Sequence, residues 1–461
     1  MRRDFGKPDR FQRTFVTLVV ALVAFCALFL AIGSAQGPKL SDAAFDDSSL
    51  MLLPQQRLTL FLNQPVESPT PADVTVIPEL PVQVSSDGDV VSVQFDRPLR
   101  YDTDYTLTIE GLQSRGLTQQ STVDYRWTTP SAELLYLDRG GDRDAIVRTG
   151  LTATTGRVVF RAENITSFVV VDEVMAVATA GDDAHARLQL VNLESGEVEE
   201  IRLPLAGAIT QLSSSETGKL IGFTLTPREP AADPVGGRRL VVLDLDRDRI
   251  PRVVEDAAGD PLAVSDWQFM PSSSSLLALG MEGSAFILDS VDDTAPIPVG
   301  RFDQISGVSQ DGTTLIAKDA RGIVLGDLSQ GEQRRLEPSL VEGTYSFIGD
   351  IAIRWGGDVI EKAALQAADG QFFISLAVDD GVDGRLLFRP PGGEGSIQAF
   401  ALSPNGQFAV VETVPTSTNA VLDGHPTEPR DVAIVTTVVD IDTGLAVRSL
   451  EGFNVVWLPV S

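Results

Sequence analysis

Cysteine and histidine are almost absent from this chain. The only cysteine among 461 residues, Cys26, lies in an apolar N-terminal stretch, so the rest of the chain cannot form an internal disulfide. A structural zinc site would need carboxylate ligands beside His185 and His425, and zinc rarely uses such a set for that purpose. We therefore expect no metal site and no cofactor, and domains large enough to be held by their own hydrophobic cores.

Basic side chains are also scarce. The sequence has 36 Lys and Arg against 64 Asp and Glu, a formal net charge of -28, and five of the basic residues lie before residue 14. A surface this acidic repels nucleic acid and anionic lipid headgroups. We therefore expect no nucleic-acid partner.

One acidic run resembles the start of a calcium-binding loop. Asp244, Asp246 and Asp248 alternate along the chain, and Glu255 follows. Arg249 occupies the position at which such loops need glycine, and a strand, hairpin and strand fit the segment better. We therefore expect no calcium here.

The longest apolar run is at the N-terminus. Phe15 to Ile32 is interrupted only by Thr17, and as a helix it is about 27 Å long, close to the thickness of a bilayer core. The basic residues before it predict a cytoplasmic tail at 1–14, an anchor at 15–35 and extracytoplasmic domains beyond. The small residues Gly33, Ser34 and Ala35 leave the alternative of a secretory signal cleaved after Ala35.

After a predicted spacer at 36–54, residues 55–130 indicate a β-sandwich, because several short apolar or alternating strands are separated by turn residues. Phe61 to Val66, Tyr105 to Gly111 and Trp127 to Thr129 resemble phrases of the bacterial Ig-like domain of cell-surface proteins. That resemblance implies a spacer or adhesion module without catalytic residues. Tyr101, Tyr105, Tyr125 and Trp127 are expected in its core rather than on a carbohydrate platform.

Residues 131–461 repeat a pattern of apolar strand, turn and apolar strand, which is typical of a β-propeller. First-strand turns near residues 172, 218, 275, 312, 370 and 406 predict six blades. A seventh is predicted where Val455 to Pro459 supplies the first strand for Leu134 to Leu137, which closes the ring. The stretch from Ser339 to Gly357 fits no blade, so the count is uncertain by one. The overall fold class is therefore all-β: an N-terminal helix, a sandwich and a seven-bladed propeller.

Two phrases resemble those of known propellers. Ser403 to Gly406 and Val438 to Gly444 are similar to segments of TolB-like and WD40-like propellers, although the Trp-Asp endings of WD40 repeats are missing. The resemblance implies a membrane-anchored or secreted protein of the bacterial envelope.

Two long loops lie on the rim that also carries the connections between blades. Pro227 to Arg239 and Val414 to Arg430 are predicted to build a partner-binding face. The candidate partner-binding residues on them are Arg228, Glu229, Arg238, Asp423, His425, Glu428 and Arg430. A solvated role for His425 is favoured over a catalytic one.

These features favour a non-catalytic, monomeric binding or scaffold protein of the cell envelope with a protein or glycan partner. A propeller-based hydrolase or lyase acting on an envelope or extracellular polymer is the alternative, and it predicts acidic, His, Tyr or Arg side chains meeting at the mouth of the ring. A third possibility is an accessory subunit of a membrane complex or sensor. The sequence lacks the G-x-S-x-G motif that a propeller peptidase would carry in a hydrolase domain.

Overall fold

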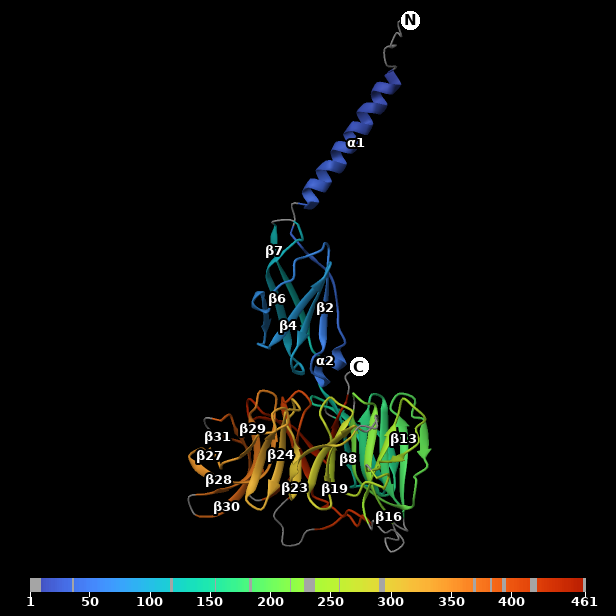
Figure 1. Ribbon diagram of the computed structural model, residues 1–461, viewed down its shortest axis with the longest axis vertical. Helices are drawn as coiled ribbons and strands as arrows, with labels where there is room; N and C mark the ends of the chain where they lie inside the picture. The colour runs from blue at the N-terminus through green and yellow to red at the C-terminus, as the bar shows by residue number, and fades with distance from the viewer. Residues whose placement is uncertain are drawn as a thin grey trace. The chain divides into compact units, whose positions relative to one another are not determined.

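The computed structural model describes residues 10–34, 37–116, 119–153, 155–181, 185–215, 217–227, 237–256, 258–289, 295–367, 370–381, 384–391, 395–414 and 421–458. The chain forms two compact units (Figure 1). One contains residues 1–46, 55–96 and 103–129, and the other contains 47–54, 97–102 and 130–461. Helix α1 spans Arg10–Ser34. Of the residues that the structure describes, none form a helix with both the length and the apolar character required to span a membrane.

The residues described in the first unit form two antiparallel sheets. One has the order β1 (Leu40–Ala44), β2 (Arg57–Leu62), β5 (Val90–Phe95), β4 (Val82–Asp87); the other has the order β3 (Val74–Ile77), β6 (Asp104–Gln113), β7 (Gln120–Thr128), with a 3-10 turn at Pro71–Asp73 before β3. Phe95 and Trp127 pack across the two sheets, with ring centroids 6.2 Å apart. The expected spacer at 36–54 is corrected in part, because Leu40–Ala44 pairs with β2 instead of forming a tether.

The described residues of the second unit form seven sheets, numbered in chain order. The first is β10 (Arg157–Ala162), β9 (Asp144–Gly150), β8 (Glu133–Asp138), β36 (Phe453–Trp457); the second is β11 (Ile165–Val171), β12 (Val174–Ala180), β13 (Ala186–Asn192), β14 (Val198–Ile201); the third is β15 (Gly207–Ser215), β16 (Leu220–Pro227), β17 (Arg239–Asp244), β18 (Arg252–Val253). The fourth is β19 (Val264–Phe269), β20 (Ser275–Gly280), β21 (Ser284–Asp289), β22 (Ile297–Arg301); the fifth is β23 (Gln304–Val308), β24 (Thr314–Asp319), β25 (Gly322–Asp327), β26 (Gln333–Arg335). The sixth is β27 (Leu340–Val341), β28 (Thr344–Ile353), β29 (Val359–Gln366), β30 (Phe372–Asp379), β31 (Gly384–Phe388); the seventh is β32 (Ser396–Leu402), β33 (Phe408–Val414), β34 (Val435–Asp440), β35 (Ala446–Glu451).

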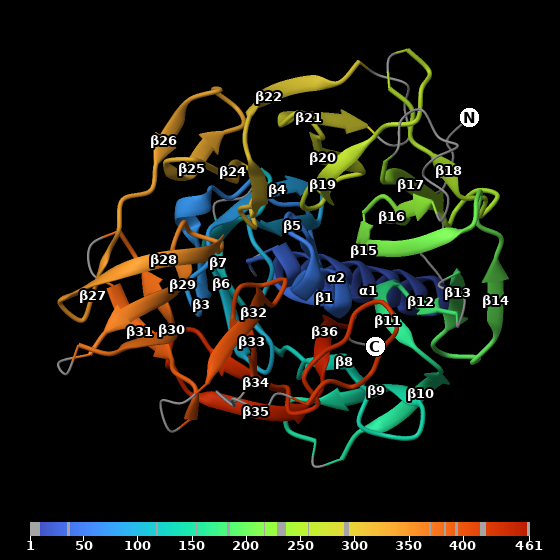
Figure 2. The same cartoon turned by 90° about the horizontal axis from the view of Figure 1, so that it is seen from below.

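Buried apolar clusters join each sheet to the next and close the seven sheets into a ring (Figure 2). One cluster joins the seventh sheet to the first and second through Ile434, Leu135 and Phe168. Strand β36 pairs antiparallel with β8, which confirms the predicted closure of the ring by the end of the chain. The hydrophobic core of this unit is therefore a circle of inter-sheet layers, and middle strands such as β12 and β16 bury both of their faces.

The sixth sheet departs from the predicted blade pattern. Ser339 to Gly357 was expected to fit no blade, yet its residues form β27 and β28. The turn near Gly370 joins β29 to β30 and is not a first-strand turn, which lies instead at Trp355–Gly357. The apolar runs on both sides of Gly370 were misleading because the middle strands of a doubly covered sheet, here β29 and β30, have similar apolar patterns.

A β-bulge recurs in the strand of each ring sheet that lies nearest the centre of the ring, which is β36, β11, β15, β19, β23, β28 or β32. The pairing of that strand with its neighbour gains one residue at each bulge, and each bulge contains a polar residue: Thr166, Gln211, Ser265, Ser306, Asp350, Gln398 or Asn454. Several bulge residues bond the next sheet; Gln211 Nε2 donates to Asp266 Oδ1 at 2.7 Å and Asn454 Nδ2 to the Phe168 carbonyl at 3.1 Å. Because bulges increase strand twist, this repeat helps the sheets to turn around a common centre.

Residues 47–54, which include helix α2 (Asp47–Leu52), and 97–102 belong to the ring unit although their neighbours in sequence do not. Tyr101 is buried and stacks on Phe408 and Trp457, with centroids 6.3 and 5.8 Å away. The Tyr101 N–H donates to Gln407 Oε1 at 2.8 Å, and Asn405 Nδ2 donates to the Leu99 carbonyl at 2.8 Å. The prediction of a core position is confirmed for Tyr101, Tyr105 and Trp127, but Tyr101 lies in the core of the other unit.

Candidate functional site

The long loop between β33 and β34 brings several predicted site residues together. Asp423, His425, Glu428 and Arg430 all lie on residues 421–434, which we call the rim loop. Its ends are joined by an antiparallel bridge between Leu422 and Asp431 and by a hydrogen bond from the Val432 N–H to the Val421 carbonyl at 2.9 Å. The loop is therefore a small hairpin with internal bonding of its own.

Of the other predicted site residues, only Arg238 can be placed, and it lies apart from the rim loop. Arg228 and Glu229 are outside the described residues. Arg238 Nη1 donates to the Ser265 carbonyl at 3.2 Å, which places Arg238 between the third and fourth sheets. The two long loops are thus not brought into one site by any contact among the described residues.

Arg139, which follows β8, anchors the rim loop. Its side chain is only 4% exposed, and its Nη1 donates to Asp423 Oδ2 at 3.1 Å and to the Glu428 carbonyl at 3.0 Å. Its Nε and Nη2 donate to the Ile165 carbonyl at 3.0 and 2.6 Å. One guanidinium therefore holds the rim loop, the end of β8 and the start of β11 together. A planar group with several fixed donors suits this task better than an ammonium.

Asp423 organises the inside of the loop. Its Oδ1 accepts the N–H groups of His425 and Arg430 at 3.0 and 3.1 Å. Burial opposes its charge, but these donors and the Arg139 guanidinium outweigh burial and lower the pKa of Asp423. For nearby Asp144, burial outweighs the Ile165 N–H and Arg139, so the pKa of that carboxyl is raised.

His425 is buried beneath the rim loop and not solvated, which corrects the expectation from sequence. Its Nδ1 accepts the Glu428 N–H at 3.0 Å, so in the neutral ring the proton lies on Nε2. Burial, followed by the charge of Arg139, lowers the pKa of His425, which favours the neutral imidazole. Nδ1 therefore helps to hold the loop, whereas Nε2 is buried without a hydrogen-bond partner among the described residues.

Arg430 and Arg139 lie against the same aromatic ring. Each guanidinium carbon lies 4.9 Å from the centroid of Phe453, at the start of β36. Arg430 also pairs with Glu412 at 3.5 Å, and Glu412 Oε1 accepts the Asn454 N–H at 2.9 Å. The C-terminal strand that closes the ring therefore also supports the rim loop.

The outer surface of the rim loop is apolar. Val421, Leu422 and Val432 are 61%, 57% and 57% exposed, while the charged side chain of Asp423 is buried. A cavity of about 1030 Å³ exists elsewhere, but the space beside this loop is smaller, about 420 Å³, and is lined by Arg139, Asp423 and the apolar run from Val432 to Val435. This loop therefore has polar groups inside and aliphatic groups outside, which is the reverse of an ordinary surface loop.

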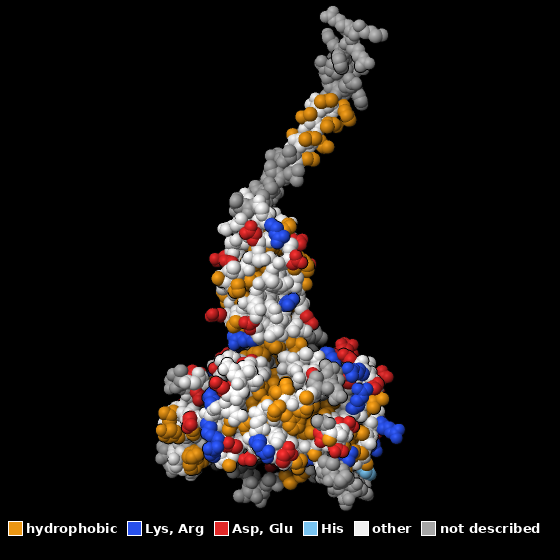
Figure 3. Space-filling view, viewed as in Figure 1, with side chains coloured by type: hydrophobic (Ala, Val, Ile, Leu, Met, Phe, Trp, Pro, Cys, Tyr) orange, Lys and Arg blue, Asp and Glu red, His pale blue; other side chains and the backbone are white. Residues whose placement is uncertain are grey.

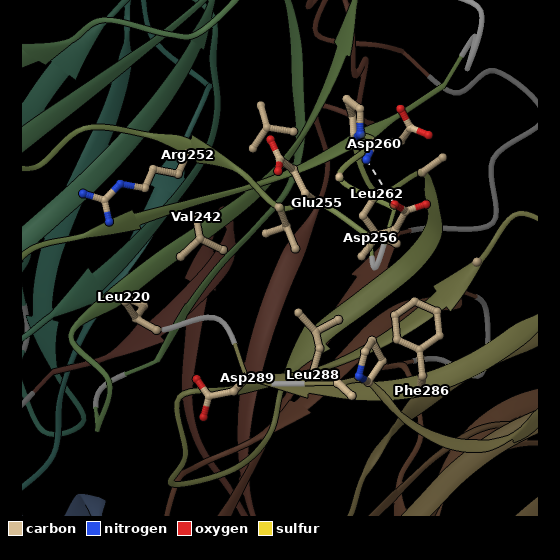
Figure 4. Close-up of a pocket in the computed structure, with 18 of the residues that line it drawn as sticks. Leu220, Val242, Arg252, Glu255, Asp256, Asp260, Leu262, Phe286, Leu288 and Asp289 are labelled. Atoms are coloured by element: carbon tan, nitrogen blue, oxygen red, sulfur yellow. Dashed lines mark hydrogen bonds between the residues drawn. The ribbon is translucent and has the colours of Figure 1, made fainter. Parts of the chain in front are cut away.

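The larger cavity is a groove between the third and fourth sheets (Figure 4). Leu220 and Val242 of the third sheet and Leu288 of the fourth form its floor, with Phe286 beside them. Its rim is mostly acidic, with these carboxylates: Asp244, Glu255, Asp256, Asp260, Glu282 and Asp289.

The aspartates with calcium-like spacing serve as turn residues. Asp244 Oδ1 accepts the N–H groups of Asp246 and Arg247 at 3.0 and 3.2 Å, and Asp248 pairs with Arg252 at 2.7 Å. In the described part of the chain, no three His, Cys, Asp or Glu side chains are grouped as metal ligands would be. The spacing therefore reflects a hairpin between β17 and β18.

Exposed aromatic side chains gather on the sixth sheet. Tyr345, Phe347 and Phe372 are exposed, and the two phenylalanine rings meet edge to face at 5.5 Å. Figure 3 shows hydrophobic side chains at the edge of the ring that carries β27, β28 and β30. This is a second apolar surface on the ring, distinct from the rim loop.

No protein-family model matches the chain, and no curated protein matches its sequence. Solved structures with a similar ring include TolB from Acinetobacter baumannii, 13% identical over 79% of this chain and 82% of that one, with a TM-score of 0.39. The ring is a β-propeller. The propeller domain of the Trilobed protease from Pyrococcus furiosus is 13% identical and covers 61% of this chain and 93% of its own, with a TM-score of 0.40. An oligogalacturonate lyase in complex with manganese is 12% identical over 65% and 83% of the two chains, with a TM-score of 0.45. These similarities to TolB-like and WD40-like propellers concern the fold alone.

Arg139, the residue that anchors the propeller's rim loop, was missed from the sequence. It lies 284 positions before Asp423, in a short connection between β8 and β9. The sequence signal that could have pointed to it was the predicted pairing of the chain's end with Leu134 to Leu137, because that closure brings the start and end of the propeller together.

Proposed function

We propose that this protein is a non-catalytic binding protein of the cell envelope, and that the rim loop of its propeller docks a partner protein. The observation that carries the proposal is the inverted polarity of the loop: Asp423 and His425 are buried, and Val421, Leu422 and Val432 are exposed. A loop held from inside by a buried guanidinium presents its aliphatic side chains with little ordering cost on binding. Aliphatic contact favours a protein partner over a glycan.

The remaining parts of the proposal rest on the sequence. The basic residues before the apolar run from Phe15 to Ile32 support an anchor with the domains outside the cytoplasm. The first unit, which resembles a bacterial Ig-like domain, would then act as the spacer. Seven joined sheets support a rigid platform for the rim loop.

The alternative of a hydrolase or lyase would use the polar side chains that meet beneath the rim loop, Arg139, Asp144, Asp423 and His425. Most of their donors and acceptors bond backbone groups of the loop and of β11, and the exception is the buried Nε2 of His425. This engagement supports a positioning role for the cluster and favours the binding proposal.

The experiment is site-specific photocrosslinking in cells. A benzoylphenylalanine at Leu422 is compared with one at Leu445, which is 66% exposed on a hairpin at the opposite rim of the same sheet. We expect one reproducible protein partner from position 422 and none from 445, and we expect V421S/V432S to abolish the crosslink while L445S leaves it intact. Failure to recover a reproducible partner at 422, or a partner insensitive to V421S/V432S, contradicts the proposal.

A further inference from the structure

The groove between the third and fourth sheets exists because the outermost strand of the third sheet ends early. Strand β18 has two residues, whereas β14 and β22, the outermost strands of the sheets on either side, have four and five. The chain then leaves the sheet in a hairpin, with a bridge between Glu255 and Pro261 and another between Ala263 and Arg239. Among the described residues, a groove is therefore left over the outer part of this inter-sheet layer.

The floor of the groove is apolar. Leu220, Val242 and Leu288 are part of the buried cluster that joins the third and fourth sheets, and Phe286 and Leu262 pack against that cluster. The volume of about 1030 Å³ is large enough for several side chains of a bound segment. Ile250, at the edge of the groove, is 58% exposed. An aliphatic ligand side chain would continue the existing core.

The rim of the groove carries excess negative charge. Its two arginines are already paired, Arg247 with Asp244 at 3.1 Å and Arg252 with Asp248 at 2.7 Å. They therefore do not balance the other carboxylates of the rim. Figure 4 shows Glu255, Asp256 and Asp260 grouped on one side of the opening, across from Phe286 and Leu288.

The turn that carries these carboxylates is well bonded. Asp256 Oδ1 accepts the N–H groups of Ala258 and Asp260 at 2.8 and 3.1 Å, and Gly259 adopts a φ of +85° that favours glycine. Asp256 is thus a structural turn residue, while Glu255 and Asp260 are the carboxylates to test.

We infer that this groove binds an extended segment of a partner protein in which Lys or Arg alternates with aliphatic residues. Its aliphatic side chains would cover the apolar floor and its cations would face Glu255 and Asp260. Nucleic acid and anionic lipid headgroups are repelled by the same carboxylates, and a neutral glycan would leave them unbalanced. The site is separate from the rim loop, so it adds to the proposed function and does not depend on it.

The test uses the full-length protein and a fluorescein-labelled nonapeptide of alternating Leu and Lys, followed by fluorescence anisotropy; the matched peptide alternates Leu and Glu. We expect binding of the Leu/Lys peptide alone, weakened about tenfold or more by E255K/D260K. The control E194K/E197K makes the same change in net charge on an exposed hairpin of the second sheet and should change affinity less than about threefold. Equal losses in the two variants would mean diffuse attraction and would overturn the inference.

A second variant tests the apolar half of the groove. I250S removes an exposed aliphatic group without altering charge or the buried core, and V198S does the same on β14. We expect I250S to weaken peptide binding about threefold and V198S to leave it unchanged. Absence of binding to the wild-type protein, or complete displacement of the peptide by millimolar putrescine, would also overturn the inference. Failure here leaves the crosslink at Leu422 unaffected, so the two proposals are tested separately.

Discussion

Arg139→Met is the substitution that most directly tests how the rim loop is held. Methionine keeps an apolar stem but removes the donors to Asp423, to the carbonyls of Ile165 and Thr166 and to that of Glu428. Asp423, whose side chain is 6% exposed, then loses its cation. Removing one partner of a buried ion pair costs about 3 to 5 kcal/mol, so the rim loop should open far more often.

Hydrogen exchange of backbone amides, read by mass spectrometry, measures that opening directly. A loss of about 3 kcal/mol in the local opening free energy accelerates exchange roughly a hundredfold, and we expect this within residues 421–434. The control is Arg335→Met, which removes an ion pair with Asp319 whose side chains are about one-third exposed; solvent screens this pair, so its loss should change exchange little. Unchanged exchange in the rim loop, or equal acceleration around Asp319 in the control, would refute the assignment of Arg139 as its anchor.

Three further predictions concern the propeller. Burial lowers the pKa of His425, so the contribution of the neutral imidazole to stability is present above the unfolded pKa of about 6.5 and is lost as pH falls. The melting temperature of His425→Gln should therefore change less between pH 7.5 and 5.5 than that of the wild type. An equal change in both proteins would exclude this role. Gln407→Ala removes the Oε1 that accepts the buried N–H of Tyr101, which costs about 1 to 3 kcal/mol. Tryptic cleavage within residues 97–102 should therefore be faster. Unaltered cleavage would count against this contact. Truncation after Gly452 removes β36 and should lower the melting temperature, measured by circular dichroism, by several degrees or more. An unchanged melting temperature would show that ring closure contributes little to stability.

Much of the fold was predictable because its signals are local. Strands separated by Asp-Gly or Asn-Gly turns have a short-range pattern, and the similarity of Val455 to Pro459 to other first strands predicted the pairing of β36 with β8. The sixth sheet was misread because its additional strand, β27, pairs with both β28 and β31. No local pattern distinguishes a strand that pairs at two edges from a connecting segment.

The candidate sites were less predictable. The length and composition of the loop from Val414 to Arg430 indicated a surface feature and drew attention to Asp423, His425 and Arg430. The sequence did not predict which side chains of the loop face inward, because the orientation of Asp423 and His425 depends on Arg139. The sequence therefore indicated the loop, but the prediction that its histidine is solvated was wrong.

By itself, the sequence determined the all-β class, the acidic surface and the closure of the propeller by its last strand, since these follow from composition and from strand and turn patterns a few residues long. Only the tertiary structure decided which residues meet. Arg139 reaches Asp423 because ring closure joins the two ends of the propeller, and the groove beside Leu288 opens because β18 stops after two residues. Contacts between residues hundreds of positions apart depend on the twist and packing of every sheet that lies between them in the chain. A sequence pattern a few residues long cannot predict these.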